Sequence, residues 1–128
     1  MAAESTLFGQ PFGEGSAFKP PVYAASTTNA ALSTYISGST LDGVTIYAGH
    51  RILLKNQTDQ PANGIYVVEG GGAAPSRSAD FDTAGDMVSG TIVAVQVGTT
   101  NGNTMWMFTT DGIIVVGTSN LAFTQLAI

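Results

Sequence analysis

Short runs of β-branched and aromatic residues follow one another along most of the chain, and turn signals separate them. Within Thr91–Val97 the alternate residues Val93, Val95 and Val97 make one face drier than the other, as in a half-buried strand. Pairs such as Asp42-Gly43 and Asn63-Gly64 suit the turns between strands. We expect strands over Val22–Thr28, Leu32–Ile36, Val44–Tyr47, Arg51–Leu54, Ile65–Val68, Thr91–Val97, Met105–Thr109, Ile113–Val116 and Leu121–Leu126.

Turn signals recur about every ten residues, a spacing typical of β-sandwiches and β-barrels. The pattern therefore predicts an all-β fold, either an antiparallel sandwich or a small barrel. Thr27–Tyr35 is the one segment where a short helix fits as well as a strand or a loop, because it contains consecutive Ala and Leu residues.

The first residues have a different pattern, because Gly and Pro interrupt Met1–Pro21 repeatedly. Leu7, Phe8, Phe12 and Phe18 nevertheless recur through this stretch, whereas purely disordered tails contain few aromatic residues. We interpret residues 1–21 as an extended N-terminal arm whose apolar side chains bind a partner, and residues 22–128 as one all-β domain. A loose terminus without a partner is the alternative.

Composition narrows the possible partners of this 128-residue chain. Charged residues make up only 10% of it, against about 25% in typical proteins, so little repulsion keeps copies apart and assembly is favoured. The net charge is −5 with four Lys and Arg residues in total, which is too few cations for nucleic-acid binding. We therefore expect no nucleic-acid partner.

Cysteine is absent, which excludes disulfides, thiolate catalysis and Cys-ligated metals. No stretch approaches the roughly 20 apolar residues that span a bilayer, and the N-terminus lacks a secretory signal pattern. We expect no membrane partner and synthesis in a cytoplasm.

The stretch Arg51–Val68 resembles a module found in structural proteins of tailed bacteriophages, including head-decoration and tail-fibre proteins. Its strand, Lys-Asn-Gln-Thr loop, Asn-Gly turn and Ile-Tyr strand carry the resemblance. Further blocks in the same order extend it to most of the chain: Leu41–Thr45, Ala79–Asp82, Gly98–Trp106, Thr109–Gly112 and Leu121–Leu126. His50 and Pro75–Ser78 depart from the module's pattern, which usually has Asp and an aromatic-x-Arg-Ala motif there.

The resemblance implies a virion protein that is synthesised in the cytoplasm of a bacterial host, and it allows both head and tail locations. A single module with a separate arm favours a capsid decoration, or cement, protein that binds the major capsid protein on the outer surface of the head. The resemblance and lattice symmetry imply a homotrimer at threefold positions. A tail-fibre or receptor-binding module that binds a surface glycan is the alternative.

Catalytic chemistry has little support in the sequence. His50 is the only histidine, and no nucleophile or orienting group is evident for it. Asp80, Asp82 and Asp86 form the densest acidic group, but they lack the ligand number and closing Glu of an EF-hand. We expect these carboxylates to cap loops and pair with Arg77. We accordingly predict no catalytic residue, no cofactor, no metal site and no enzymatic activity.

Three other residues are candidates for subunit or ligand contacts. On a strand, Trp106 and Phe108 share one face while Met105 and Met107 share the other, so one face suits the core and the other a contact. Tyr66 is expected to be an exposed aromatic residue that contacts a subunit or a ligand.

Overall fold

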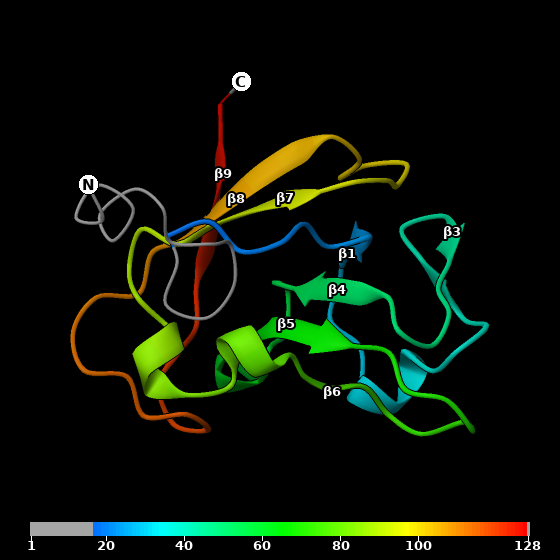
Figure 1. The fold of residues 1–128 in the computed structure, drawn as a ribbon, viewed down its shortest axis with the longest axis horizontal. Coiled ribbons are helices and arrows are strands. Elements are labelled where there is room, and N and C mark those ends of the chain that lie inside the picture. Colours follow the sequence, from blue (N-terminus) through cyan, green and yellow to red (C-terminus); the bar gives the residue numbers. More distant parts are fainter. Residues whose placement is uncertain (1–16, 128) are drawn as a thin grey trace, which may run out of the picture.

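The computed structural model describes residues 17–127, in which strands dominate (Figure 1). The strands are β1 (Ala24–Ala25), β2 (Thr40–Leu41), β3 (Val44–Thr45), β4 (Arg51–Leu54), β5 (Gly64–Val67), β6 (Ser76–Arg77), β7 (Ile92–Val95), β8 (Thr104–Phe108) and β9 (Phe123–Leu126). Short 3-10 helices lie at η1 (Leu32–Thr34), η2 (Gln60–Ala62), η3 (Ala79–Phe81) and η4 (Ala84–Asp86). The predicted all-β class is confirmed.

The described strands form three sheets, with orders β1-β4-β5-β6, β2-β3 and β7-β8-β9. The pairing of β1 with β4 is parallel and the other pairings are antiparallel. None of these sheets closes on itself within residues 17–127, so the barrel alternative is wrong for the described part of the chain.

Residues 17–26, which we call the linking segment, are hydrogen-bonded to both larger sheets. Its N–H groups donate to carbonyls of β7 and β4: Lys19 to Ile92 at 3.0 Å, Val22 to Ala94 at 2.9 Å, Tyr23 to Arg51 at 2.7 Å and Ser26 to Leu53 at 2.9 Å. Figure 1 shows this segment running between β7 and β4. The two sheets are therefore joined edge to edge through it.

The linking segment includes the last residues of the predicted arm. Residues 17–21 had been assigned to the arm, but Ala17 and Lys19 exchange backbone hydrogen bonds with Ile92. Phe18 also forms a parallel bridge with Ile92. The described end of the predicted arm therefore pairs with β7, and the division of the chain at Pro21 stays a prediction.

The core consists of two clusters on opposite faces of β4. Leu53 points into the cluster shared with the three-stranded sheet, which contains Val22, Ile65, Phe81, Val93, Val95, Phe108, Ile114 and Leu121. Ile52 and Leu54 point into the other, with Ala24, Tyr35, Leu41, Ile46, Tyr66 and Val68. Successive side chains of a strand alternate between faces, so the continuous apolar run of β4 suits a strand buried on both sides.

Two predicted strands are wrong. Leu32–Ile36 contains the 3-10 helix η1, so the short helical alternative for Thr27–Tyr35 describes it better. Ile113–Val116 is a loop, and it lies between Gly112 and Gly117, which have φ values of +85° and +88°. These left-handed residues turn the chain at both ends of the apolar run, which leaves it no room to extend.

Candidate partner-binding surface

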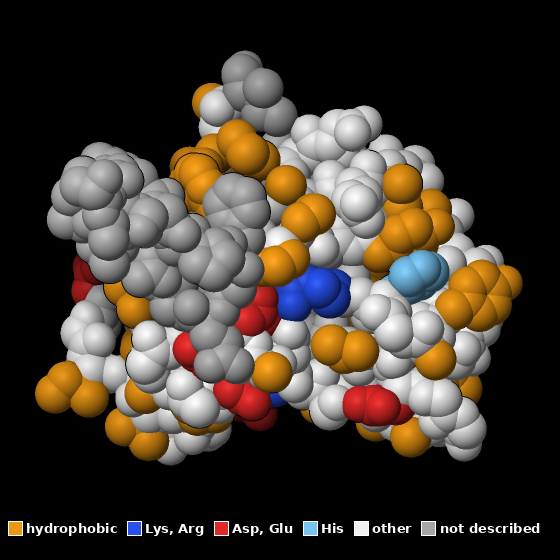
Figure 2. All heavy atoms as spheres, in the orientation of Figure 1, with side chains coloured by type: hydrophobic (Ala, Val, Ile, Leu, Met, Phe, Trp, Pro, Cys, Tyr) orange, Lys and Arg blue, Asp and Glu red, His pale blue; other side chains and the backbone are white. Residues whose placement is uncertain are grey.

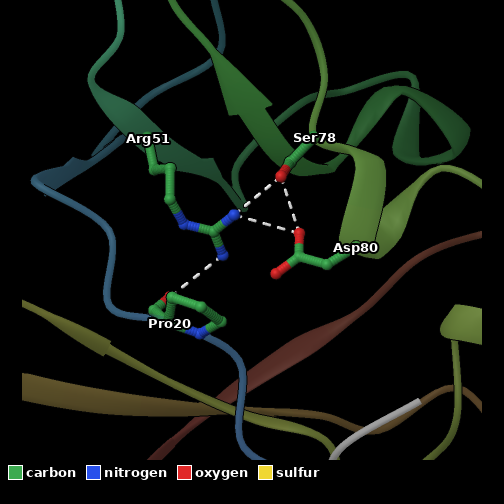
Figure 3. A network of polar contacts seen from close by, with 4 residues as sticks. All are labelled: Pro20, Arg51, Ser78 and Asp80. Atoms are coloured by element: carbon green, nitrogen blue, oxygen red, sulfur yellow. Dashed lines mark hydrogen bonds and ion pairs between the residues drawn. The ribbon is translucent and has the colours of Figure 1, made fainter. Parts of the chain in front are cut away.

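The linking segment is held by a polar network centred on Arg51 of β4 (Figure 3). Arg51 Nη2 donates to the Pro20 carbonyl at 2.9 Å, while Nη1 donates to Ser78 Oγ at 2.6 Å and Asp80 Oδ1 at 3.0 Å. Ser78 Oγ in turn donates to Asp80 Oδ1 at 2.6 Å. Pro20 and Pro21 have no N–H and cannot donate to a β-ladder, and the guanidinium anchors this stretch through the Pro20 carbonyl instead.

Asp80 is a buried carboxylate whose charge this network stabilises. Burial by itself raises the pKa of Asp80, but hydrogen bonds from Arg51 and Ser78 and the nearby charges of Arg51 and Lys19 outweigh it. The net pKa therefore lies below the ordinary aspartate value. Lys19 is only 4% exposed, so the linking segment also brings a buried cation to this place.

The expected pairing of the acidic group with Arg77 is wrong for Asp80, which pairs with Arg51. Arg77 instead donates to the carbonyls of Asn63 at 2.9 Å and Pro61 at 2.7 Å. The Asp86 carboxylate accepts a hydrogen bond from the Thr83 hydroxyl at 3.0 Å, a contact between two side chains, so loop capping stays a prediction.

The three-stranded sheet is apolar on both faces. Cross-strand partners share a face, and the pairs Ala94↔Met105, Met105↔Leu126 and Ile92↔Met107 lie opposite the buried Val93, Val95 and Phe108. We call Ile92, Ala94, Met105, Met107 and Leu126 the outer apolar face. An antiparallel sheet usually presents polar residues on its second face, so this face suits a contact with another molecule.

A hollow of about 190 Å³ opens on this face between the linking segment and the strands. It is lined by Phe18, Lys19, Ile92, Ala94 and Met105. Phe18 is 49% exposed and Met105 37%, and Figure 2 shows hydrophobic side chains gathered over this end of the sheet. Three residues predicted from the sequence, Phe18, Met105 and Met107, are thus placed on or beside one surface.

The other predicted arm contacts, Leu7, Phe8 and Phe12, lie outside the described residues. Phe18 is the one predicted arm contact among the described residues, and its backbone forms the parallel bridge with Ile92 of β7.

Tyr66 is not the exposed aromatic residue that the sequence suggested. It is 3% exposed, and its hydroxyl donates to the Ala62 carbonyl at 2.6 Å. The Arg77 guanidinium lies 5.1 Å from the ring centroid. Tyr66 sits opposite Ile52 in the β4–β5 register, and both side chains enter the second core cluster.

A second exposed apolar surface, which sequence reasoning missed, is the loop over residues 112–117. Ile113 is 93% exposed, and Val115 and Val116 are exposed as well, whereas Ile114 is 7% exposed and packs in the core. The flanking Gly112 and Gly117 were the available signal, since they indicate a turn at each end rather than a strand.

His50 occupies a structural position. Its ring stacks on Tyr23 with centroids 4.0 Å apart, and its Nδ1 accepts a hydrogen bond from the Tyr47 N–H at 3.0 Å. Within residues 17–127, no group of three or more His, Cys, Asp or Glu residues could hold a metal ion. No helix in that range is long and apolar enough to cross a membrane.

Comparison with known proteins found no relative: no family model matches the chain, and no curated protein or solved structure is significantly similar to it. The resemblance to tailed-phage structural modules therefore stays a prediction. The geometry of the outer apolar face and the linking segment has to support any functional proposal by itself.

Proposed function

We propose that this protein is a capsid decoration protein of a tailed bacteriophage, which binds the outer surface of the head and stabilises the capsid lattice. The observation that carries the proposal is the position of the linking segment beside the outer apolar face. The Ile92 N–H donates to the Ala17 carbonyl at 2.7 Å, so the first described residue of the chain lies at the rim of that face. Arm and face can thus engage one partner together.

The way the linking segment is held suits a mechanical role. Force applied to residues before Ala17 along the segment would load its bonds to β7 and β4 and the Arg51–Pro20 contact together. Hydrogen bonds that share a load resist it better than bonds broken one after another. A clamp of this kind would let the arm hold a capsid that is under internal pressure.

The outer apolar face would supply the binding energy at the major capsid protein. Burial of apolar surface contributes about 25 cal/mol per Å², and the scarcity of charge keeps the desolvation cost low. Each contact can be modest, because many copies on one lattice strengthen the attachment through avidity. The corresponding location is the capsid surface of the virion, where the resemblance implies a homotrimer at threefold positions of the lattice.

The glycan-binding, tail-fibre alternative relied on an exposed aromatic residue. Sugar rings stack on accessible aromatic faces; Tyr66 at 3% exposure offers none, whereas Tyr47 is 56% exposed. The burial of Tyr66 removes the particular residue on which the alternative was based, and the decoration proposal rests on the outer apolar face instead.

The test is reattachment to purified capsids that lack the protein. We expect a truncation of residues 1–16 to fold and to bind capsids much more weakly in co-sedimentation. Residues 17–21 must be kept, because Lys19 and Pro20 belong to the buried network. Met105→Asp, which places a charge on the outer apolar face, should also weaken binding at least about tenfold.

Tyr47→Asp is the control, because Tyr47 is 56% exposed, more than Met105 at 37%, but lies beside His50 and outside the outer apolar face. Undiminished capsid binding by both the truncation and Met105→Asp would contradict the proposal. Binding of the intact protein to host glycans instead of capsids would favour the tail-fibre alternative.

A further inference from the structure

Strand β9 has one edge bonded to β8 and one edge that faces away from the sheet. The Thr109 N–H donates to the Ala122 carbonyl at 2.9 Å, which sets the phase of the ladder. Hydrogen-bonded and non-bonded pairs alternate along an antiparallel ladder, and Met107 lies opposite Thr124. Thr124 therefore directs its backbone groups to β8, while Phe123 and Gln125 direct their N–H and C=O groups outward.

These outward backbone groups have no hydrogen-bond partner within residues 17–127. Thr124 and Gln125 are exposed, and Figure 1 shows the C-terminal end of β9 extending beyond the rest of the ribbon. The opposite edge of the same sheet, at β7, is covered by the linking segment. The free edge of β9 is thus an accessible template for another extended strand.

The usual protection of a free edge is missing from β9. Natural edge strands carry Lys, Pro, a bulge or an inward-pointing charge that prevents pairing with other chains. Residues 119–128 contain no charged residue and no proline. The pairing of β8 with β9 also runs without a break from Phe108↔Phe123 to Met105↔Leu126. A flat, neutral edge favours pairing rather than preventing it.

We propose that β9 pairs with β9 of a second copy of this chain, antiparallel about a two-fold axis near Thr124. In this register Phe123 of one copy lies opposite Gln125 of the other, and the outward backbone groups exchange hydrogen bonds. A strand that faces itself must avoid like charges, and the neutral β9 meets that condition. The pairing joins the two three-stranded sheets into one sheet.

The outer apolar face supports the choice of a second copy. Leu126 on β9 continues the row of Ala94 and Met105 to the free edge. Pairing through β9 places Leu126 of one copy opposite Ala122 of the other and Thr124 opposite Thr124, so the two outer apolar faces lie on the same side of the joined sheet and form one larger surface. This inference does not depend on the capsid proposal, because it concerns the free protein.

The experiment is sedimentation of the full-length chain carrying a charge at the two-fold axis. We expect the unmodified protein to be dimeric, and Thr124→Lys and Thr124→Glu each to raise the dimer Kd at least about tenfold through like-charge repulsion. An equimolar mixture of the two variants should recover a mixed dimer, because opposite charges then face each other. Recovery distinguishes pairing at β9 from a loss of folding.

Gln125→Pro provides a second test, because it removes an outward N–H while the bonds of Thr124 to β8 remain. Thr28→Lys is the matched control at an exposed threonine far along the chain from β9. A monomeric unmodified protein would overturn the inference, as would a dimer or trimer unchanged by the Thr124 variants. Capsid binding is measured separately, so either proposal can fail without the other.

Discussion

The Arg51 guanidinium donates a hydrogen bond to the Pro20 carbonyl at 2.9 Å and forms an ion pair with the Asp80 carboxylate at 3.0 Å. One side chain thus connects β4, the linking segment and η3. It does so at the place where two prolines prevent the linking segment from forming a regular ladder. The network therefore fixes the position of the linking segment on the rest of the fold.

Arg51→Ala should destabilise the protein by about 2–4 kcal/mol, because it leaves the Asp80 carboxylate buried without its ion-pair partner. Arg51→Lys should lose less stability than Arg51→Ala but still some, because an ammonium lacks the planar fork that contacts Pro20, Ser78 and Asp80 together. Urea unfolding of the three proteins measures both effects. Equal stability of Arg51→Ala and the unmodified protein would show that this network does not stabilise the fold.

Acid should weaken the same network by protonating the Asp80 carboxylate. The pKa of Asp80 is lower in the folded protein than the ordinary value of 3.8, so the ionised form stabilises the fold. That contribution is present above the unfolded-state pKa and is lost as the pH falls through the lower, folded-state pKa. Asp80→Asn should remove it. The stability difference between the two proteins, measured by urea unfolding from neutral pH to pH 2, should shrink at the acidic end.

Neighbouring isoleucines in the 112–117 loop should respond in opposite ways. Ile114→Ala should cost about 2–4 kcal/mol, because Ile114 packs in the core cluster and its loss leaves a cavity. Ile113→Ser should change stability by less than about 0.5 kcal/mol, since Ile113 is 93% exposed. Thermal unfolding separates the two. Comparable losses would mean that the loop packs differently.

Gly64→Ala should destabilise the fold by about 1–3 kcal/mol. Gly64 has φ +144°, a conformation that residues with a Cβ rarely adopt. A Cβ there would also lie 2.5 Å from Arg77 Nη1, which donates to the Asn63 carbonyl. Gly38→Ala is the control, because Gly38 also has positive φ but open space around it. The excess loss at Gly64 over Gly38, measured by urea unfolding, reports the clash with Arg77.

Local pattern predicted several elements well. Arg51–Leu54 was expected as a strand and forms β4 with the same bounds, because a continuous apolar run suits a strand buried on both faces. The alternation within Thr91–Val97 correctly gave the buried face of β7, with Val93 and Val95 inside. The placement of Met105 and Met107 opposite Phe108 was likewise correct, since strand parity decides it.

Other features depended on contacts that the sequence does not display. Tyr66 and Met105 both stand on short apolar strands, yet Tyr66 is buried and Met105 is exposed. The difference arises because a second core cluster covers β5, whereas no described element covers the outer apolar face. Parity states which residues share a face, but it does not state which face is covered.

By itself, the sequence determined the all-β class, the strongest strands and the scarcity of charge, because these follow from residue type and short-range alternation. Only the tertiary structure decided that residues 17–26 join two sheets, that Arg51 rather than Arg77 pairs with Asp80, and that β9 keeps a free edge. Arg51 and Asp80 lie 29 positions apart. Contacts over such separations are chosen by the packing of the whole chain, which local pattern does not encode.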